Sequence, residues 1–209
     1  KLIICLPGGV LENVIWLTGY ENLCYLIIDN PELAGRIFEA VGAREVEYFE
    51  RCIRHRVVGA IIGNDDWGFK SQTMLAPDQM RRFVFPWHRQ FVSVAHSQGK
   101  PAILHSCGNL AAVMDDIIDD IKYDAKHSYE DAIIPVEDAY VKYHKRIAVL
   151  GGIDVDFVCR SQPETVYERS RVMLKRGSSG YALGTGNSVP DYVPDSNYFA
   201  MIRAAIDQR

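Results

Sequence analysis

Six short apolar runs recur along the chain, and most of them are rich in β-branched residues. They cover residues 2–6, 57–63, 101–105, 123–128, 146–152 and 180–186. Their apolar positions are continuous rather than alternating, which is typical of strands that are buried on both faces. The pattern therefore predicts six strands of a parallel sheet.

Helix signals separate these runs. The predicted helices cover residues 31–56, 77–99, 109–121, 161–177 and 194–209. Asn30 can cap the first helix, with Pro31 at the first helical position. Pro86 lies inside the second helix and should kink it. Ser161 and Glu164 stand at capping-box spacing where the fourth helix is expected to begin.

Alternating strands and helices indicate an α/β fold with a parallel sheet and helices outside it. Two architectures of the sheet fit this pattern: an open doubly wound sheet and an eight-stranded (β/α) barrel. We expect one domain over residues 1–209, because this length can bury a full core. Six strands fit the barrel if its first strands are missing, and the chain opens on Lys1 rather than Met, so we expect sequence upstream.

Composition and charge narrow the classes of partner. The chain is 48% hydrophobic and 24% charged, which is ordinary for a globular protein, and its formal charge is -4. Without a basic stripe, nucleic acid is not an expected partner. The chain has no apolar run of the roughly 18 residues that a membrane span needs, so we expect a cytoplasmic protein. The five cysteines lack the spacing of a disulfide framework and are expected to be reduced.

Candidate functional residues follow the predicted strands. In either architecture, the carboxyl ends of parallel strands meet at one rim of the sheet, where active sites lie. The residues at this rim are Asp65, Asp66, His105, Cys107, His127, Glu130, Asp154, Gly184, Thr185, Gly186, Asn187 and Ser188. Acids, imidazoles and a thiol at one rim are typical of an active site, because each polar group must otherwise be desolvated or paired.

His105 and Cys107 are the candidate metal ligands. Residues two apart in an extended strand point to the same side, so imidazole and thiol should converge. Zn²⁺ accepts such a mixed set, and a catalytic zinc commonly has three protein ligands and an open position. Two alternatives stay open: plain core packing, and a cysteine–histidine nucleophilic pair oriented by His127 or Glu130.

The aspartates that follow the strands, and the glycine-rich turn after the last strand, can each be interpreted as functional or as structural. Asp65 and Asp66 can bind substrate cations, act as acid and base, or cap the following helix. Asp154 can orient substrate or cap a turn. Residues 184–188 can cradle an anion on backbone N–H groups, although they lack the spacing of a phosphate-binding loop.

The order of five motifs resembles the uroporphyrinogen decarboxylase family. The motifs are "DDWG", "LAPDQMRRFVFPW", "ILHSCGN", "VLGGID" and "ALGTGNSVPDYVPDSNYFAMI". The resemblance extends from about Trp16 to the end and implies the carboxyl-terminal two thirds of a family barrel of eight βα units. The family includes the decarboxylase and zinc-dependent methyltransferases that pass a methyl group from a methylated corrinoid or another donor to a thiol.

The resemblance implies zinc ligands and also shows a departure. The His-x-Cys-Gly stretch of the methyltransferase branch is matched by His105 and Cys107. Its third ligand, a cysteine in the turn after the last strand, is replaced by Thr185, a poor zinc ligand. His127, Glu130 or Asp154 could then complete the shell. The histidine that the decarboxylase branch has in this turn is also replaced by Thr185.

We therefore expect a zinc-assisted methyltransferase with a corrinoid as substrate or on a partner protein. Asp65, Asp66, Glu130 and Asp154 are the expected catalytic residues, and residues 184–188 are expected to hold a carboxylate or sulfonate tail of the substrate. The alternatives are a metal-free uroporphyrinogen decarboxylase and an inactive barrel that binds a corrinoid or small molecule. A homodimer is one expected assembly, because barrels of this family often pair.

Overall fold

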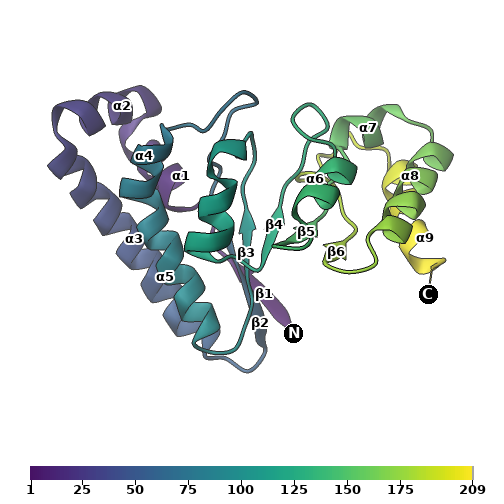
Figure 1. Cartoon of the computed structure of the whole chain (residues 1–209), viewed down its shortest axis with the longest axis horizontal. Helices are drawn as coiled ribbons and strands as arrows, with labels where there is room; N and C mark the ends of the chain where they lie inside the picture. Colours follow the sequence, from purple (N-terminus) through teal and green to yellow (C-terminus); the bar gives the residue numbers. More distant parts are fainter. Residues whose placement is uncertain (209) are drawn as a thin grey trace. The chain divides into compact units, whose positions relative to one another are not determined.

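The computed structural model describes residues 1–208, and the chain divides into two compact units, Lys1–Asp124 and Ala125–Arg209. The first unit contains the parallel strands β1 (Leu2–Cys5), β2 (Val58–Asn64) and β3 (Ala102–His105), with β2 between the other two (Figure 1). The second unit contains the parallel strands β4 (Ala125–His127), β5 (Ala148–Leu150) and β6 (Tyr181–Ala182). All six predicted strands are therefore confirmed. The prediction of a single domain stays a prediction.

Helices lie between the strands, as the alternation predicts. In the first unit they are α1 (Val10–Thr18), α2 (Tyr20–Asp29), α3 (Pro31–Ile53), α4 (Pro77–Gln79) and α5 (Phe85–His96). In the second unit they are α6 (Val136–Tyr143), α7 (Val155–Arg160), α8 (Pro163–Arg176) and α9 (Asp195–Ile206). The sequence signals did not reveal α1, α2, α6 or α7. Within residues 1–208, no helix combines the length and the apolar character that a bilayer span requires.

Helix α3 begins where the sequence predicts. The Asn30 side chain accepts a hydrogen bond from the backbone N–H of Leu33 at 3.1 Å, and Pro31 occupies the first turn. The helix lies beside α5 (Figure 1), and its Phe49 packs edge-on against Phe91 of α5 with ring centroids 5.1 Å apart. Because both rings are buried, this contact holds the helical layer together beside β2.

Residues 77–96 are helical throughout, as α4, a π-helical segment at Met80–Val84 and α5, so the predicted helix is present. The π-helical segment lies directly before α5, whose first turn contains Pro86, and the kink expected at Pro86 stays a prediction. Two other predicted details are wrong. Residues 109–121 form a short 3₁₀ turn and a π-helical segment rather than one α-helix. Helix α8 is capped by Gln162, not by a box of Ser161 and Glu164, because Pro163 fixes the first helical position.

Strand β1 also departs from the prediction of burial on both faces. The side chains of Leu2 and Ile3 are 60% and 57% exposed. The structure places β1 at the edge of the sheet, where it pairs with β2 on one side. By contrast, Ile61 of the central strand β2 is completely buried.

Candidate metal centre

The loops that follow β2 and β3 are fastened to each other. The backbone N–H of Asp65 donates to the carbonyl of His105 at 3.0 Å, which continues the strand pairing past the end of β2. The next link uses a side chain, since the backbone N–H of Trp67 donates to Ser106 Oγ at 3.1 Å. Both Trp67 and Ser106 are fully buried. These bonds leave the loops little freedom to move independently.

Two glycines allow the loops to touch backbone to backbone. Gly108 has φ of +86°, and a Cβ atom there would lie 2.1 Å from the carbonyl oxygen of Gly68. A Cβ atom on Gly68 would in turn lie 2.8 Å from the backbone nitrogen of Asn109. That nitrogen donates to the carbonyl of Phe69 at 2.7 Å. Only glycine fits this contact, so the loop geometry around Cys107 is set by the backbone.

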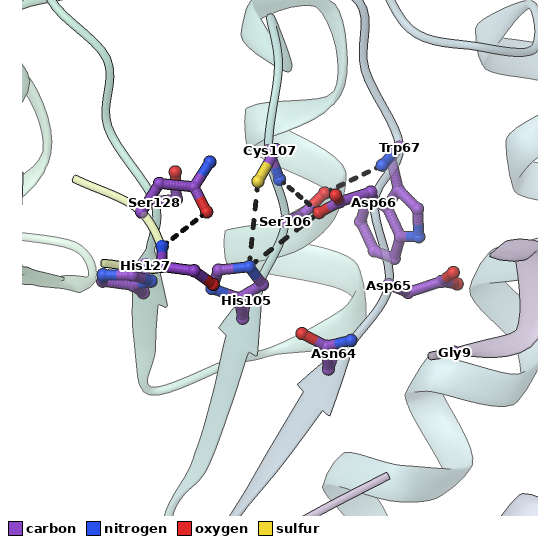
Figure 2. A network of polar contacts seen from close by, with 12 residues as sticks. Gly9, Asn64, Asp65, Asp66, Trp67, His105, Ser106, Cys107, His127 and Ser128 are labelled. Carbon is purple, nitrogen blue, oxygen red and sulfur yellow. Dashed lines mark hydrogen bonds and ion pairs between the residues drawn. The ribbon is translucent and has the colours of Figure 1, made fainter. Parts of the chain in front are cut away.

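Asp66, His105 and Cys107 point toward one another at the ends of β2 and β3 (Figure 2). Cys107 Sγ lies 3.7 Å from His105 Nε2, and Asp66 Oδ1 lies 3.9 Å from the same nitrogen. One donor atom from each residue falls within 4.8 Å of the other two. The backbone N–H of Cys107 also donates to Asp66 Oδ1 at 2.8 Å. The expected convergence of His105 and Cys107 is present, and Asp66 joins them.

The arrangement suits a shared cation better than a proton relay. In a nucleophile–histidine–acid relay the nucleophile and the acid use opposite nitrogens of the imidazole. Here both Cys107 Sγ and Asp66 Oδ1 face His105 Nε2. A tetrahedral zinc with Zn–N near 2.0 Å and Zn–S near 2.3 Å would place nitrogen and sulfur about 3.5 Å apart, close to the observed separation. The donor set and its spacing therefore fit zinc.

Asp65 has a different role from its neighbour. It is completely buried and points toward Gly9, away from Cys107 (Figure 2). Its carboxylate accepts the backbone N–H groups of Leu11 and Glu12, each at 3.0 Å, in the first turn of α1. Asp65 thus caps a helix, but this helix is α1, which precedes it in the chain, and not the following helix that the capping alternative named. The catalytic role expected for Asp65 stays a prediction.

His88 completes the environment of Asp65. His88 Nε2 lies 3.0 Å from Asp65 Oδ2, and His88 Nδ1 lies 2.7 Å from the hydroxyl of Tyr123. Burial, reinforced by the negative charge of Asp65, raises the pKa of Tyr123 well above its usual value. His88 is not among the residues that the sequence predicts for the site, because it lies in a helix without motif spacing. The only available signal was a histidine on the apolar face of that helix.

Further acids surround Asp65. Glu45 of α3 is buried, and its Oε1 accepts a hydrogen bond from the side chain of Asn13 at 3.1 Å. Burial, with the charge of Asp65 second, raises the pKa of Glu45 to about 8. Burial also raises the pKa of Glu12, helped by the charges of Asp65 and Asp66. Two acids from helices α1 and α3 therefore lie close to the aspartates that follow β2.

The remaining predicted residues belong to the second unit. Asp154 caps α7, since its carboxylate accepts the backbone N–H groups of Phe157 and Asp131. The hydroxyl of Thr185 donates to the carbonyl of Asn187 at 2.7 Å, and His127 Nε2 lies 2.9 Å from the carbonyl of Thr185. The catalytic roles expected for Glu130 and Asp154 stay predictions. The same holds for the substrate-binding role of Gly184, Thr185, Gly186, Asn187 and Ser188.

Comparison with solved structures shows the fold. A methyltransferase from Methanosarcina mazei superposes with a TM-score of 0.80 and 17% sequence identity, covering 99% of this chain and 58% of that chain. The chain thus spans less than two thirds of the length of that methyltransferase. The likeness identifies the α/β fold as the TIM-type fold rather than the doubly wound sheet.

Comparison at the level of sequence shows the family. No curated protein sequence matches the chain. The family model described as uroporphyrinogen decarboxylase (URO-D) matches residues 8–207, which is nearly the whole chain. The chain belongs to the uroporphyrinogen decarboxylase family.

Proposed function

We propose that this protein is a metal-assisted methyltransferase that moves a methyl group from a corrinoid, or another methyl donor, to a thiol. The observation that carries the proposal is the 3.7 Å approach of Cys107 Sγ to His105 Nε2 at the end of β3. These two groups match the zinc-binding residues of the methyltransferase branch. The structural likeness to a methyltransferase agrees with this branch.

The residues of the chain would divide the work. Zn²⁺ held by His105 and Cys107 would lower the pKa of an incoming thiol, so that the thiolate exists at neutral pH. The glycine contact between the loops holds the imidazole and the sulfur in place before the thiol arrives. Residues 184–188 would bind a carboxylate or sulfonate tail of the acceptor, and Glu130 and Asp154 would orient it.

In the proposed methyl transfer from a methylated corrinoid, one bond forms and one bond breaks. A lone pair of the acceptor thiolate forms the new sulfur–carbon bond, while the cobalt–carbon bond of the donor breaks and leaves both its electrons on cobalt. The proton of the thiol goes to solvent. We propose that the corrinoid reaches the site free or on a partner protein.

Charge favours this function over decarboxylation of a tetrapyrrole. A porphyrinogen substrate carries many carboxylates and needs a cationic surface. The strand ends of the first unit instead carry Asp65 and Asp66, close to Glu12 of α1, and burial, helped by the charges of these two aspartates, raises the pKa of Glu12. A polyanion would be repelled here, whereas a metal cation would be attracted.

The test measures metal and turnover separately. Purified protein is expected to contain about one zinc per chain, and His105→Ala and Cys107→Ala are expected to lose it. Cys159→Ala is the matched control, because this half-buried cysteine lies in α7. The second measurement is the rate of methyl transfer from methylcobalamin to a small thiol, monitored by the change in absorbance as the cobalt–carbon bond is lost. This rate should fall to background in both variants. Zinc-free parent protein, or turnover that survives both substitutions, would refute the proposal.

A further inference from the structure

We infer that Asp66 is the third protein ligand of the zinc in the proposed methyltransferase, so that one nitrogen, one sulfur and one oxygen of the first unit hold the metal. The inference rests on the proposed function and goes beyond it. It replaces the family's cysteine, whose position is held here by Thr185, with a carboxylate from the loop after β2.

The position of Asp66 is set by the loop that carries Cys107. The backbone N–H of Cys107 donates to Asp66 Oδ1 at 2.8 Å, so the carboxylate is oriented by the residue that would share the metal with it. A carboxylate has about four lone-pair sites, and this bond uses one of them. Asp66 therefore keeps the capacity to coordinate while its direction is fixed.

Electrostatics gives the second reason. A thiolate, a carboxylate and the unprotonated nitrogen of a neutral imidazole are all electron-pair donors, and these three atoms lie within 4.8 Å of one another. The side chains of His105 and Asp66 are only 17% and 35% exposed, so water screens charges at this site poorly. A divalent cation bound here would be balanced by the two negative charges of a Cys107 thiolate and the Asp66 carboxylate. The cluster is arranged as a cation site requires.

Two of the other candidates for the third ligand, Asp154 and His127, are engaged locally. The carboxylate of Asp154 caps α7 and accepts the backbone N–H of Asp131. His127 Nε2 lies 2.9 Å from a backbone carbonyl, that of Thr185, whose hydroxyl donates to Asn187. Each would have to give up a local contact to bind metal, whereas Asp66 already faces His105 and Cys107.

A carboxylate in place of a second thiolate has a chemical consequence. Oxygen is a harder ligand than sulfur, so the site should favour Zn²⁺ and Co²⁺ over softer thiophilic ions more than a two-cysteine site would. Three protein ligands leave a fourth tetrahedral position for the acceptor thiol. The acceptor sulfur would then be the second sulfur on the metal, in the place that a protein cysteine takes in the family pattern.

The experiment measures zinc affinity by competition with a chromogenic chelator, together with the absorption spectrum of the Co²⁺-loaded protein. Asp66→Asn is the main variant, because its amide oxygen can still accept the Cys107 N–H while the charge is lost. We expect zinc affinity to fall by at least about tenfold, and Asp66→Cys to bind Co²⁺ with a stronger sulfur-to-metal charge-transfer band than the parent. Asp78→Asn is the control, an exposed aspartate of α4.

The outcomes separate the two proposals. Unchanged zinc affinity in Asp66→Asn, with zinc lost in His105→Ala and Cys107→Ala, would overturn the inference and leave the proposed metal site intact. Loss of zinc in Asp66→Asn without methyl transfer in the parent would support the inference and refute the proposed reaction. Circular dichroism of each variant identifies any that has lost its fold. If Asp66→Asn has lost its fold, the charge-transfer band of Co²⁺-loaded Asp66→Cys decides whether residue 66 binds the metal.

Discussion

Two neighbouring aspartates after β2 differ in burial and in the groups that they contact. Asp65 is completely buried and holds the start of α1 and His88, whereas Asp66 is part exposed and faces His105 and Cys107. The alternation of side chains along an extended backbone sends the two carboxylates to opposite sides. At the residue scale, one aspartate thus stabilises the fold, and its neighbour is the proposed metal ligand.

At Gly108, the energetic cost of steric crowding can be distinguished from the cost of a positive φ by comparison with Gly99. Gly108→Ala places a methyl group against the Gly68 carbonyl at a position with φ of +86°, so we expect a loss of at least about 2 kcal/mol in unfolding free energy and weaker zinc binding. Gly99 also has positive φ, at +61°, but nothing lies within 4 Å of its would-be Cβ. Gly99→Ala should therefore cost only about 1 kcal/mol. Urea denaturation of both variants checks this, and equal losses would contradict it.

Glu45 should make stability depend on pH. Its folded-state pKa of about 8 lies above the ordinary value of 4.5, so between these values the folded protein binds more protons than the unfolded chain. The stabilising contribution is complete below pH 4.5 and is lost as pH rises toward 8. Glu45→Gln should remove this loss, which amounts to a few kcal/mol at about 1.4 kcal/mol per pKa unit.

The measurement for Glu45 is the unfolding free energy in urea at several pH values from 5 to 9. Glu50→Gln is the matched control, because Glu50 is an exposed acid in the same helix α3. The prediction fails if Glu45→Gln and the parent lose stability in parallel as the pH rises.

At the scale of elements, α1 depends on a residue outside its own sequence. Its cap residue is Gly9, which has no side chain to accept the first N–H groups. Asp65, from the end of β2, supplies the acceptor and also contacts His88 of α5. One carboxylate therefore joins a helix start, a strand end and a second helix.

Substitution of the two aspartates should separate these functions. Asp65→Ala leaves two helix N–H groups and the His88 imidazole without their buried acceptor, so we expect a loss of about 3–5 kcal/mol in unfolding free energy. Asp66→Ala removes one part-exposed acceptor and should cost about 1 kcal/mol or less, while reducing zinc content. Chemical denaturation and metal analysis of both variants provide the check. A larger loss of stability in Asp66→Ala than in Asp65→Ala would contradict the structural role given to Asp65 and the binding role proposed for Asp66.

At the scale of the whole molecule, the candidate metal centre belongs to one of two compact units. Asp66, His105 and Cys107 all lie within Lys1–Asp124. The three tryptophans of the chain, Trp16, Trp67 and Trp87, lie in the same unit. Tryptophan fluorescence therefore reports on the unit that holds the metal centre, whereas circular dichroism reports on both units.

Zinc removal should destabilise the first unit selectively. Free zinc at about 100 times its dissociation constant adds about 2.7 kcal/mol to the stability of the folded state. A chelator should therefore move the fluorescence-detected urea transition to lower urea in the parent but not in Cys107→Ala. An identical shift in both proteins would show that the stabilising zinc is bound elsewhere.

The sequence by itself determined the features that depend on local geometry. The α/β class, the six strands and the Asn30 cap follow from neighbouring residues, and all are confirmed. The approach of His105 to Cys107 also follows locally, because residues two apart in an extended chain share a side.

Tertiary structure decided the features that join distant segments. Asp66 meets Cys107 across 41 positions of sequence, and Asp65 meets α1 across 54, so no spacing rule could have assigned them. The reason is physical: periodicity governs where a side chain points, whereas the packing of strands and loops governs which side chain it meets.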